Sequence, residues 1–73
     1  MITEAEYELL RKGYFVFPVN VPEPMRPLAN NLVRRGYLLR GMEFRDSHAR
    51  LCVPYTLTQV GEFKVLDYQE AQK

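Results

Sequence analysis

The hydrophobic positions along the chain switch between helical and extended spacing, and the first segment is helical. It follows Thr3 and ends at Gly13. Thr3 and Glu6 have the spacing of a capping box, and Ile2 and Tyr7 occupy the hydrophobic-staple positions. Glycine just past the last helical residue is typical of a helix C-terminus, so the pattern predicts a first helix of about ten residues.

An extended segment comes next. Residues from Tyr14 to Val19 are mostly aromatic or β-branched, which is the composition of a β-strand. Pro18 must lie on an edge strand or at the strand end, because proline cannot donate a hydrogen bond to a sheet. Three prolines within residues 20–27 exclude regular helix there. We therefore expect a strand followed by a stiff, irregular connection.

A second amphipathic helix is predicted from about Pro27 to Arg35, with Gly36 as its stop. A helical wheel divides its residues into an apolar side and a polar side. The apolar side comprises Met25, Leu28, Ala29, Leu32 and Val33. The polar side comprises Arg26, Asn30, Asn31, Arg34 and Arg35.

The next segments have the pattern of a β-hairpin. Residues 37–44 form one predicted strand, and Gly41 inside it indicates a bulge or bend. Residues 45–48 are polar and predict the turn. Residues 49–57 form the return strand, interrupted by Pro54.

The last predicted helix covers residues 59–71, with Thr58 as its N-cap. Val60, Phe63 and Leu66 share one side of this helix. Gly61 is expected to weaken its first turn, since glycine costs about 1 kcal/mol relative to alanine in a helix.

Length and charge limit the classes of function. Seventy-three residues allow one domain, 1–73, with one small core. The net charge is +1, but residues 24–52 carry six arginines against two carboxylates, whereas both ends are acidic. Cys52 is the only cysteine, so no internal disulfide can form and a reducing compartment is expected. The chain has neither a signal-peptide pattern nor a membrane-spanning apolar run, which predicts a cytoplasmic protein.

Three short motifs occur in a fixed order along the second half of the chain. They are Leu32 with Gly36-Tyr37-Leu38, the charged tip 45–50, and Leu57-Thr58-x-x-Gly61. This order resembles winged-helix domains of the MarR/PadR type, in which a recognition helix and Gly-Tyr-Leu precede a hairpin wing and Leu-Thr-x-x-Gly. The start, residues 2–10, also looks like the first helix of such domains.

The resemblance covers most of the chain and has two implications. It implies an α+β fold, a small winged-helix-like single domain in the order helix-strand-helix-strand-strand-helix, and a role in transcription. The chain departs from the family pattern where a full helix usually precedes the recognition helix, because residues 20–27 are proline-rich. The helix-turn-helix is therefore truncated or absent, while the helix-plus-wing order is kept.

Two sets of residues are candidate contact sites. A protein-binding set lies on the first helix, because Tyr and Arg are frequent interface anchors. It comprises Tyr7, Glu8, Arg11 and Lys12. A nucleic-acid-binding set lies on the second helix and the wing, because Arg suits guanine edges and phosphate, and Asn suits adenine edges. It comprises Arg26, Asn30, Asn31, Arg34, Arg35, Arg45, His48 and Arg50. The alternative for each set is an ordinary solvated surface.

Catalytic and metal chemistry have little support in the sequence. His48 and Cys52 are the only soft metal ligands, and two do not make a zinc site. A Cys–His nucleophile pair would need an oxyanion-stabilising loop, and no Gly-rich loop is nearby. Cys52 is expected to be a small buried hydrophobe. We expect no enzyme activity, no cofactor and no small-molecule substrate.

Two functional hypotheses remain. The favoured one is a regulator that binds a protein of the transcription machinery and alters initiation or termination, with an RNA polymerase subunit as one candidate target. The size of the chain is similar to that of small phage-encoded transcription regulators, which act in the bacterial host cytoplasm. The alternative is a DNA-binding repressor or activator that reads DNA with helix 26–35 and wing 45–50, and that would dimerise.

Overall fold

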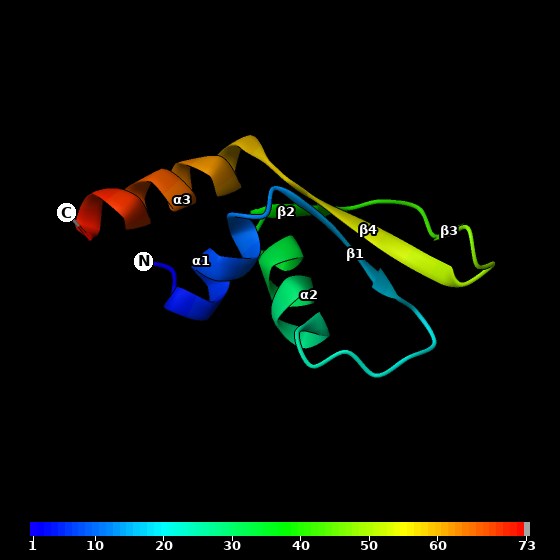
Figure 1. Ribbon diagram of the computed structural model, residues 1–73. Coiled ribbons are helices and arrows are strands. Elements are labelled where there is room, and N and C mark those ends of the chain that lie inside the picture. Colours follow the sequence, from blue (N-terminus) through cyan, green and yellow to red (C-terminus); the bar gives the residue numbers. More distant parts are fainter. Residues whose placement is uncertain (73) are drawn as a thin grey trace.

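Three helices and four β-strands make up the computed structural model, which describes residues 1–72 (Figure 1). In chain order the elements are α1 (Glu4–Leu10), β1 (Tyr14–Pro18), α2 (Arg26–Arg34), β2 (Leu38–Arg40), β3 (Phe44–Arg45), β4 (Leu51–Leu57) and α3 (Gln59–Ala71). The predicted α+β fold and the order helix, strand, helix, strands, helix are confirmed.

The first helix begins as its sequence predicts, but it has seven residues and not about ten, because it ends at Leu10 and a turn at residues 11–12 precedes Gly13. The Thr3 side chain accepts the backbone N–H of Glu6, and the Glu6 side chain accepts the N–H of Thr3 at 2.8 Å, which completes the capping box. Gly13 ends the segment with a φ of 74°, in the left-handed region that favours glycine. Gly36 has a φ of 84° after α2 and serves the same purpose.

The sheet is antiparallel, and β4 is its central strand. On one side β4 pairs with β1, where Phe15 lies opposite Tyr55 and Pro18 lies opposite Cys52. On the other side β4 pairs with β2 and then β3. Pro18 is thus the last residue of an edge strand, as the sequence predicts.

The outgoing half of the hairpin differs from the single strand predicted over residues 37–44. The structure contains two short strands, β2 and β3, and residues 41–43 between them lie opposite only residues 53–54. Pro54 explains the break, because it has no N–H to donate on this side of β4, while its carbonyl accepts the N–H of Gly41 at 2.9 Å. A Cβ on Gly41 would lie 2.8 Å from the Pro54 ring. The bulge predicted at Gly41 is therefore a consequence of Pro54.

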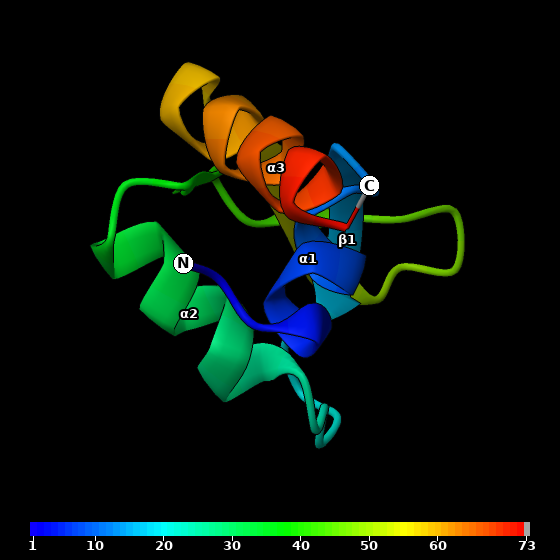
Figure 2. The same ribbon diagram turned by 90° about the vertical axis from the view of Figure 1, so that its left-hand side faces the viewer.

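The hydrophobic core lies between one face of the sheet and the helices. Figures 1 and 2 show α1 and α2 side by side on the same side of the sheet. Tyr55 of β4 is fully buried, with its ring centroid 5.1 Å from that of Phe15 and 5.5 Å from that of Phe17. The core also contains Leu9, Leu10, Ala29, Leu32, Leu38, Val53 and Val65.

At the start of α3, the Leu57-Thr58-x-x-Gly61 segment contacts the Gly36-Tyr37 segment that follows α2. Thr58 caps this helix as predicted, since its hydroxyl oxygen accepts the N–H of Gly61 at 3.0 Å. The same hydroxyl donates to the carbonyl oxygen of Gly36 at 2.7 Å, and the N–H of Thr58 donates to the carbonyl of Tyr37 at 3.1 Å. Gly61 is buried beneath that carbonyl. Leu-Thr-x-x-Gly therefore holds the start of α3 against the turn that follows α2.

The rest of α3 extends beyond the end of the sheet (Figure 1). The molecule is accordingly elongated, with principal extents of 43 × 22 × 20 Å. Val65 is buried against the core, and the ring of Tyr68 stacks on Tyr7 of α1 with centroids 4.3 Å apart. On the opposite side of α3, Val60, Phe63 and Leu66 are each about half exposed.

Candidate interaction surfaces

The partly buried side chain of Arg26 folds back onto the loop that precedes α2. Its Nη2 donates to the carbonyl oxygen of Pro18 and to that of Val21, the latter at 2.8 Å. Its Nη1 donates to the carbonyl of Val19 at 3.3 Å, and its Nε is buried. The guanidinium thus holds the end of β1 and the following loop against the start of α2. The predicted role of Arg26 in reading DNA conflicts with this position.

The two asparagines of α2 also have partners inside the molecule. The hydroxyl of the buried Tyr55 donates to Asn30 Oδ1 at 2.9 Å, so the Asn30 side chain is turned toward the core. Asn31 remains exposed, and its Oδ1 accepts from Arg35 Nη1 at 3.4 Å. Asn30 Oδ1 therefore serves as the hydrogen-bond acceptor of a buried hydroxyl, a role that competes with contact to a DNA base edge.

Arg35 connects α2 to α1. Its Nη1 forms an ion pair with Glu6 Oε2 at 2.5 Å, and its guanidinium lies 4.8 Å from the centroid of the Tyr37 ring. Lys64 of α3 lies over the same ring, with Nζ 5.7 Å from the centroid. Arg34 is exposed as well. Of the three arginines of α2 in the predicted nucleic-acid-binding set, Arg26 and Arg35 are held by contacts within the domain.

Alanine substitution of Arg26 and of Arg34 should distinguish an arginine that stabilises the fold from one that is exposed to solvent. We expect Arg26→Ala to lower the free energy of unfolding by about 2 kcal/mol, because three carbonyl oxygens lose a charged donor. The matched Arg34→Ala change should stay within about 0.5 kcal/mol, as is usual at exposed positions. Urea unfolding followed by circular dichroism measures both. Equal stability of the two variants would show that the Arg26 contacts contribute nothing.

The Glu6 carboxylate gives folding stability a defined pH dependence. Burial acts to raise its pKa, but the N–H of Thr3 and the Arg35 guanidinium together hold the pKa below its ordinary value of 4.5. Because the folded-state pKa is the lower one, the stabilisation is complete above pH 4.5 and is lost as the pH falls through the folded-state value.

The variant Glu6→Gln isolates this charge, because glutamine can still complete the capping box. We expect wild type to exceed the variant in unfolding free energy by about 1 kcal/mol at pH 7. The difference should shrink below pH 4.5. Urea titrations of both proteins between pH 7 and pH 2.5 measure this difference in unfolding free energy. A difference that grows on acidification would contradict the assigned ion pair.

The wing tip is held by an acidic residue within it. Asp46 Oδ1 accepts the N–H groups of His48 and Arg50, each at 2.9 Å, and its Oδ2 accepts Arg50 Nε at 2.9 Å. The backbone N–H of Arg50, ahead of the other contacts, lowers the pKa of the Asp46 carboxyl. Arg45 donates to the carbonyl of Ala49 at 2.9 Å. The positive charge of Arg50 is therefore opposed within the wing, and His48 and Arg45 remain at its exposed tip.

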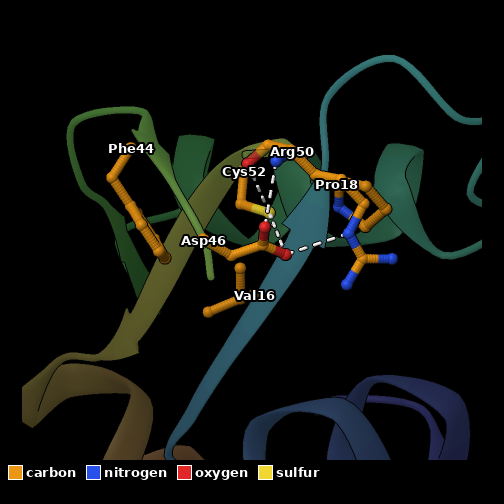
Figure 3. Close-up of a pocket in the computed structure, with 6 residues that line it drawn as sticks. All are labelled: Val16, Pro18, Phe44, Asp46, Arg50 and Cys52. Carbon is orange, nitrogen blue, oxygen red and sulfur yellow. Dashed lines mark hydrogen bonds and ion pairs between the residues drawn. The ribbon is translucent and has the colours of Figure 1, made fainter. Parts of the chain in front are cut away.

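Beside the wing tip is a pocket of about 320 Å³ on the face of the sheet away from α1 and α2 (Figure 3). It is lined by Val16, Pro18, Phe44, Asp46, Arg50 and Cys52. Cys52 is buried as predicted, and its Sγ lies 3.8 Å from Asp46 Oδ2 and 3.5 Å from the carbonyl oxygen of Arg50.

The predicted protein-binding set on α1 divides into a packed residue and three exposed ones. Tyr7 stacks on Tyr68, and its hydroxyl accepts Gln69 Nε2 at 3.1 Å, so it fixes α1 to α3. Arg11 pairs with Glu8 at 3.3 Å, and both side chains are more than half exposed. Lys12 joins these two around a shallow depression in the surface.

Two groups of exposed apolar side chains lie outside both predicted sets. Val60, Phe63 and Leu66 of α3 are 49%, 55% and 49% exposed. Tyr14, Leu39 and Phe44 are exposed on the sheet face opposite α1 and α2. The sequence contained a signal for the first group, since α3 has apolar residues on both sides and a domain of this size can bury only one of them.

Two further features of residues 1–72 bear on function. No group of three His, Cys, Asp or Glu side chains in this range is placed to hold a metal ion. None of the helices in the same range is long and apolar enough to cross a membrane.

Comparison of the sequence with protein-family models gave no match, and neither the curated proteins nor the solved structures compared with it contain a detectable relative.

Proposed function

We propose that this protein is a non-enzymatic regulator that binds a protein of the transcription machinery, with an RNA polymerase subunit as the favoured target. Binding alters transcription initiation or termination. The bacterial cytoplasm is the compartment in which such a chain meets the polymerase, and it keeps the lone Cys52 reduced.

The internal pairing of arginines on the basic side of α2 is the observation that favours a protein target over DNA. Arg26 donates to three backbone carbonyls, and Arg35 pairs with Glu6. In the wing, Arg50 pairs with Asp46. Affinity for duplex DNA depends on the number of phosphates that free cations neutralise, so this surface offers a small electrostatic contribution.

Exposed apolar side chains favour the same conclusion. Small monomeric domains rarely leave large contiguous apolar patches in water, and such patches mark contacts with other proteins. Here one side of α3 and the outer face of the sheet both present large apolar residues. A surface of this composition suits a protein partner better than a phosphate backbone does.

The link to transcription rests on the winged-helix resemblance. In support, α2 is followed by a hairpin and then by α3, and the Gly36-Tyr37 and Thr58-x-x-Gly61 segments are in direct contact. The alternative, a winged-helix DNA-binding repressor or activator, is favoured by the exposure of Arg34, Arg45 and His48.

A pull-down from bacterial lysate with the tagged chain tests the proposal. Nuclease treatment before capture removes partners that are held through DNA or RNA. We expect RNA polymerase subunits to be recovered after nuclease, and Arg34→Ala to recover them equally well. Retention of DNA before nuclease, with no polymerase subunit afterwards, would contradict the proposal and favour the DNA-binding alternative.

A further inference from the structure

The side of α3 that faces away from α1 carries an apolar stripe. It consists of Val60, Phe63 and Leu66, each about half exposed. On the opposite side of the same helix Gly61 and Val65 are buried, and Tyr68 packs on Tyr7. Since contacts with the core already occupy one side of α3, the stripe is a second apolar surface that folding leaves in water.

The helix that carries the stripe is firmly held. Thr58 caps its N-terminus, and Gly61 lies so close to the Tyr37 carbonyl that a Cβ would come within 2.1 Å of the oxygen. Near the C-terminal end Gln69 donates to the Tyr7 hydroxyl at 3.1 Å. A rigid helix with exposed apolar residues loses little conformational entropy on binding, which is what a helix-in-groove contact requires.

The charges around the stripe specify the chemistry of the partner. Glu62 and Asp67 are exposed on α3, whereas Lys64 lies over the Tyr37 ring. An apolar stripe bordered by carboxylates matches an apolar groove bordered by cations.

We propose that the stripe Val60–Phe63–Leu66 docks into an apolar groove on the protein target, with Lys or Arg side chains along the rim of that groove. This inference rests on the proposed function and assigns the contact surface for it. Phe63 is the central anchor, and Glu62 and Asp67 face the cationic rim.

A second copy of the chain fits the stripe less well. Self-association would bring the same carboxylate-bordered surface against itself, and Lys64, the cation of α3 nearest to Glu62 and Asp67 in sequence, already lies over the Tyr37 ring. A heterologous partner with cations around its groove would supply the opposite charge.

Titration of purified bacterial RNA polymerase with fluorescently labelled variants tests the inference. Phe63→Ser should weaken binding at least about thirtyfold, as expected for a central interface anchor. Met42→Ser is the matched control, because Met42 is an apolar residue of the hairpin with 89% exposure, and its affinity should stay within about threefold of wild type. Thermal unfolding of both variants confirms that each one folds.

Charge reversal tests the cationic rim. Glu62→Lys should weaken binding more strongly at low salt than at high salt, because exposed charges are screened by ions. Glu43→Lys, a reversal in the hairpin, should leave the affinity unchanged. Equal loss from both reversals would overturn the assignment of the rim.

The outcomes separate this inference from the proposed function. If the wild-type chain binds the polymerase and Phe63→Ser binds it equally well, the inference is overturned and the proposed function still holds. Absence of wild-type binding to polymerase overturns the proposed function, and the inference with it. A dimer in sedimentation that Phe63→Ser abolishes would also overturn the inference, because the stripe would then bind its own copy.

Discussion

Replacement of Gly61 by alanine is expected to destabilise the protein by about 3 kcal/mol, although the same change usually stabilises a helix by about 1 kcal/mol. An added Cβ would lie 2.1 Å from the carbonyl oxygen of Tyr37 and 2.7 Å from Leu57 Cδ1. The carbonyl cannot move aside freely, because it accepts the N–H of Thr58. Helix α3 would have to separate from the turn after α2.

Urea unfolding of Gly61→Ala measures this effect. The control is Gln59→Ala, an exposed change in the same turn that should stay within about 0.5 kcal/mol of wild type. If Gly61→Ala is as stable as wild type or more so, the close contact between the two glycine motifs is absent in solution.

The second large effect is expected at Tyr55. Truncation to alanine should cost about 4 kcal/mol, since it empties a fully buried site between Phe15 and Phe17 in the central strand. Tyr55→Phe keeps the ring and removes only the hydroxyl that donates to Asn30. The loss should then be about 1 kcal/mol.

A double-mutant cycle with Tyr55→Phe and Asn30→Ala tests the position of the asparagine. Residues joined by a hydrogen bond should show a coupling energy of at least about 0.5 kcal/mol. Additive effects would mean that the Asn30 side chain is not held by Tyr55 and is available to a ligand on the polar side of α2.

The local structure was predictable from the sequence because local signals determine it. The Thr3–Glu6 capping box and the Thr58 cap each join residues three positions apart. The break between β2 and β3 was only half predictable. Gly41 indicated a bulge, but the cause is Pro54 across the sheet, and its effect on a particular partner depends on the strand register.

The candidate surfaces were less predictable, because distant contacts decide them. A helical wheel places Arg26, Asn30 and Arg35 together on a polar face. Their partners are backbone carbonyls of the preceding loop, a tyrosine 25 residues away and a glutamate 29 residues away. A wheel shows which side of a helix is polar, but it does not show which polar groups fold back onto the domain.

For α3, the spacing of apolar residues did not show which side of the helix contacts the core. The spacing of Val60, Phe63 and Leu66 places them on one side of α3, and the core contacts the other side, which carries Gly61 and Val65. The close contact of Gly61 with Tyr37 determines the orientation of the helix, and a glycine carries no hydrophobic signal. The expectation that Gly61 merely weakens the first turn overlooked this packing role.

Fluorescence anisotropy of the labelled wild-type chain, with purified RNA polymerase alone and with duplex DNA alone, tests most directly whether the target is a protein. We expect saturable binding to the polymerase without DNA, and only a modest loss of affinity when salt is raised. Binding to DNA alone, with an affinity that falls by about 10³-fold or more between 50 and 200 mM salt, would contradict it.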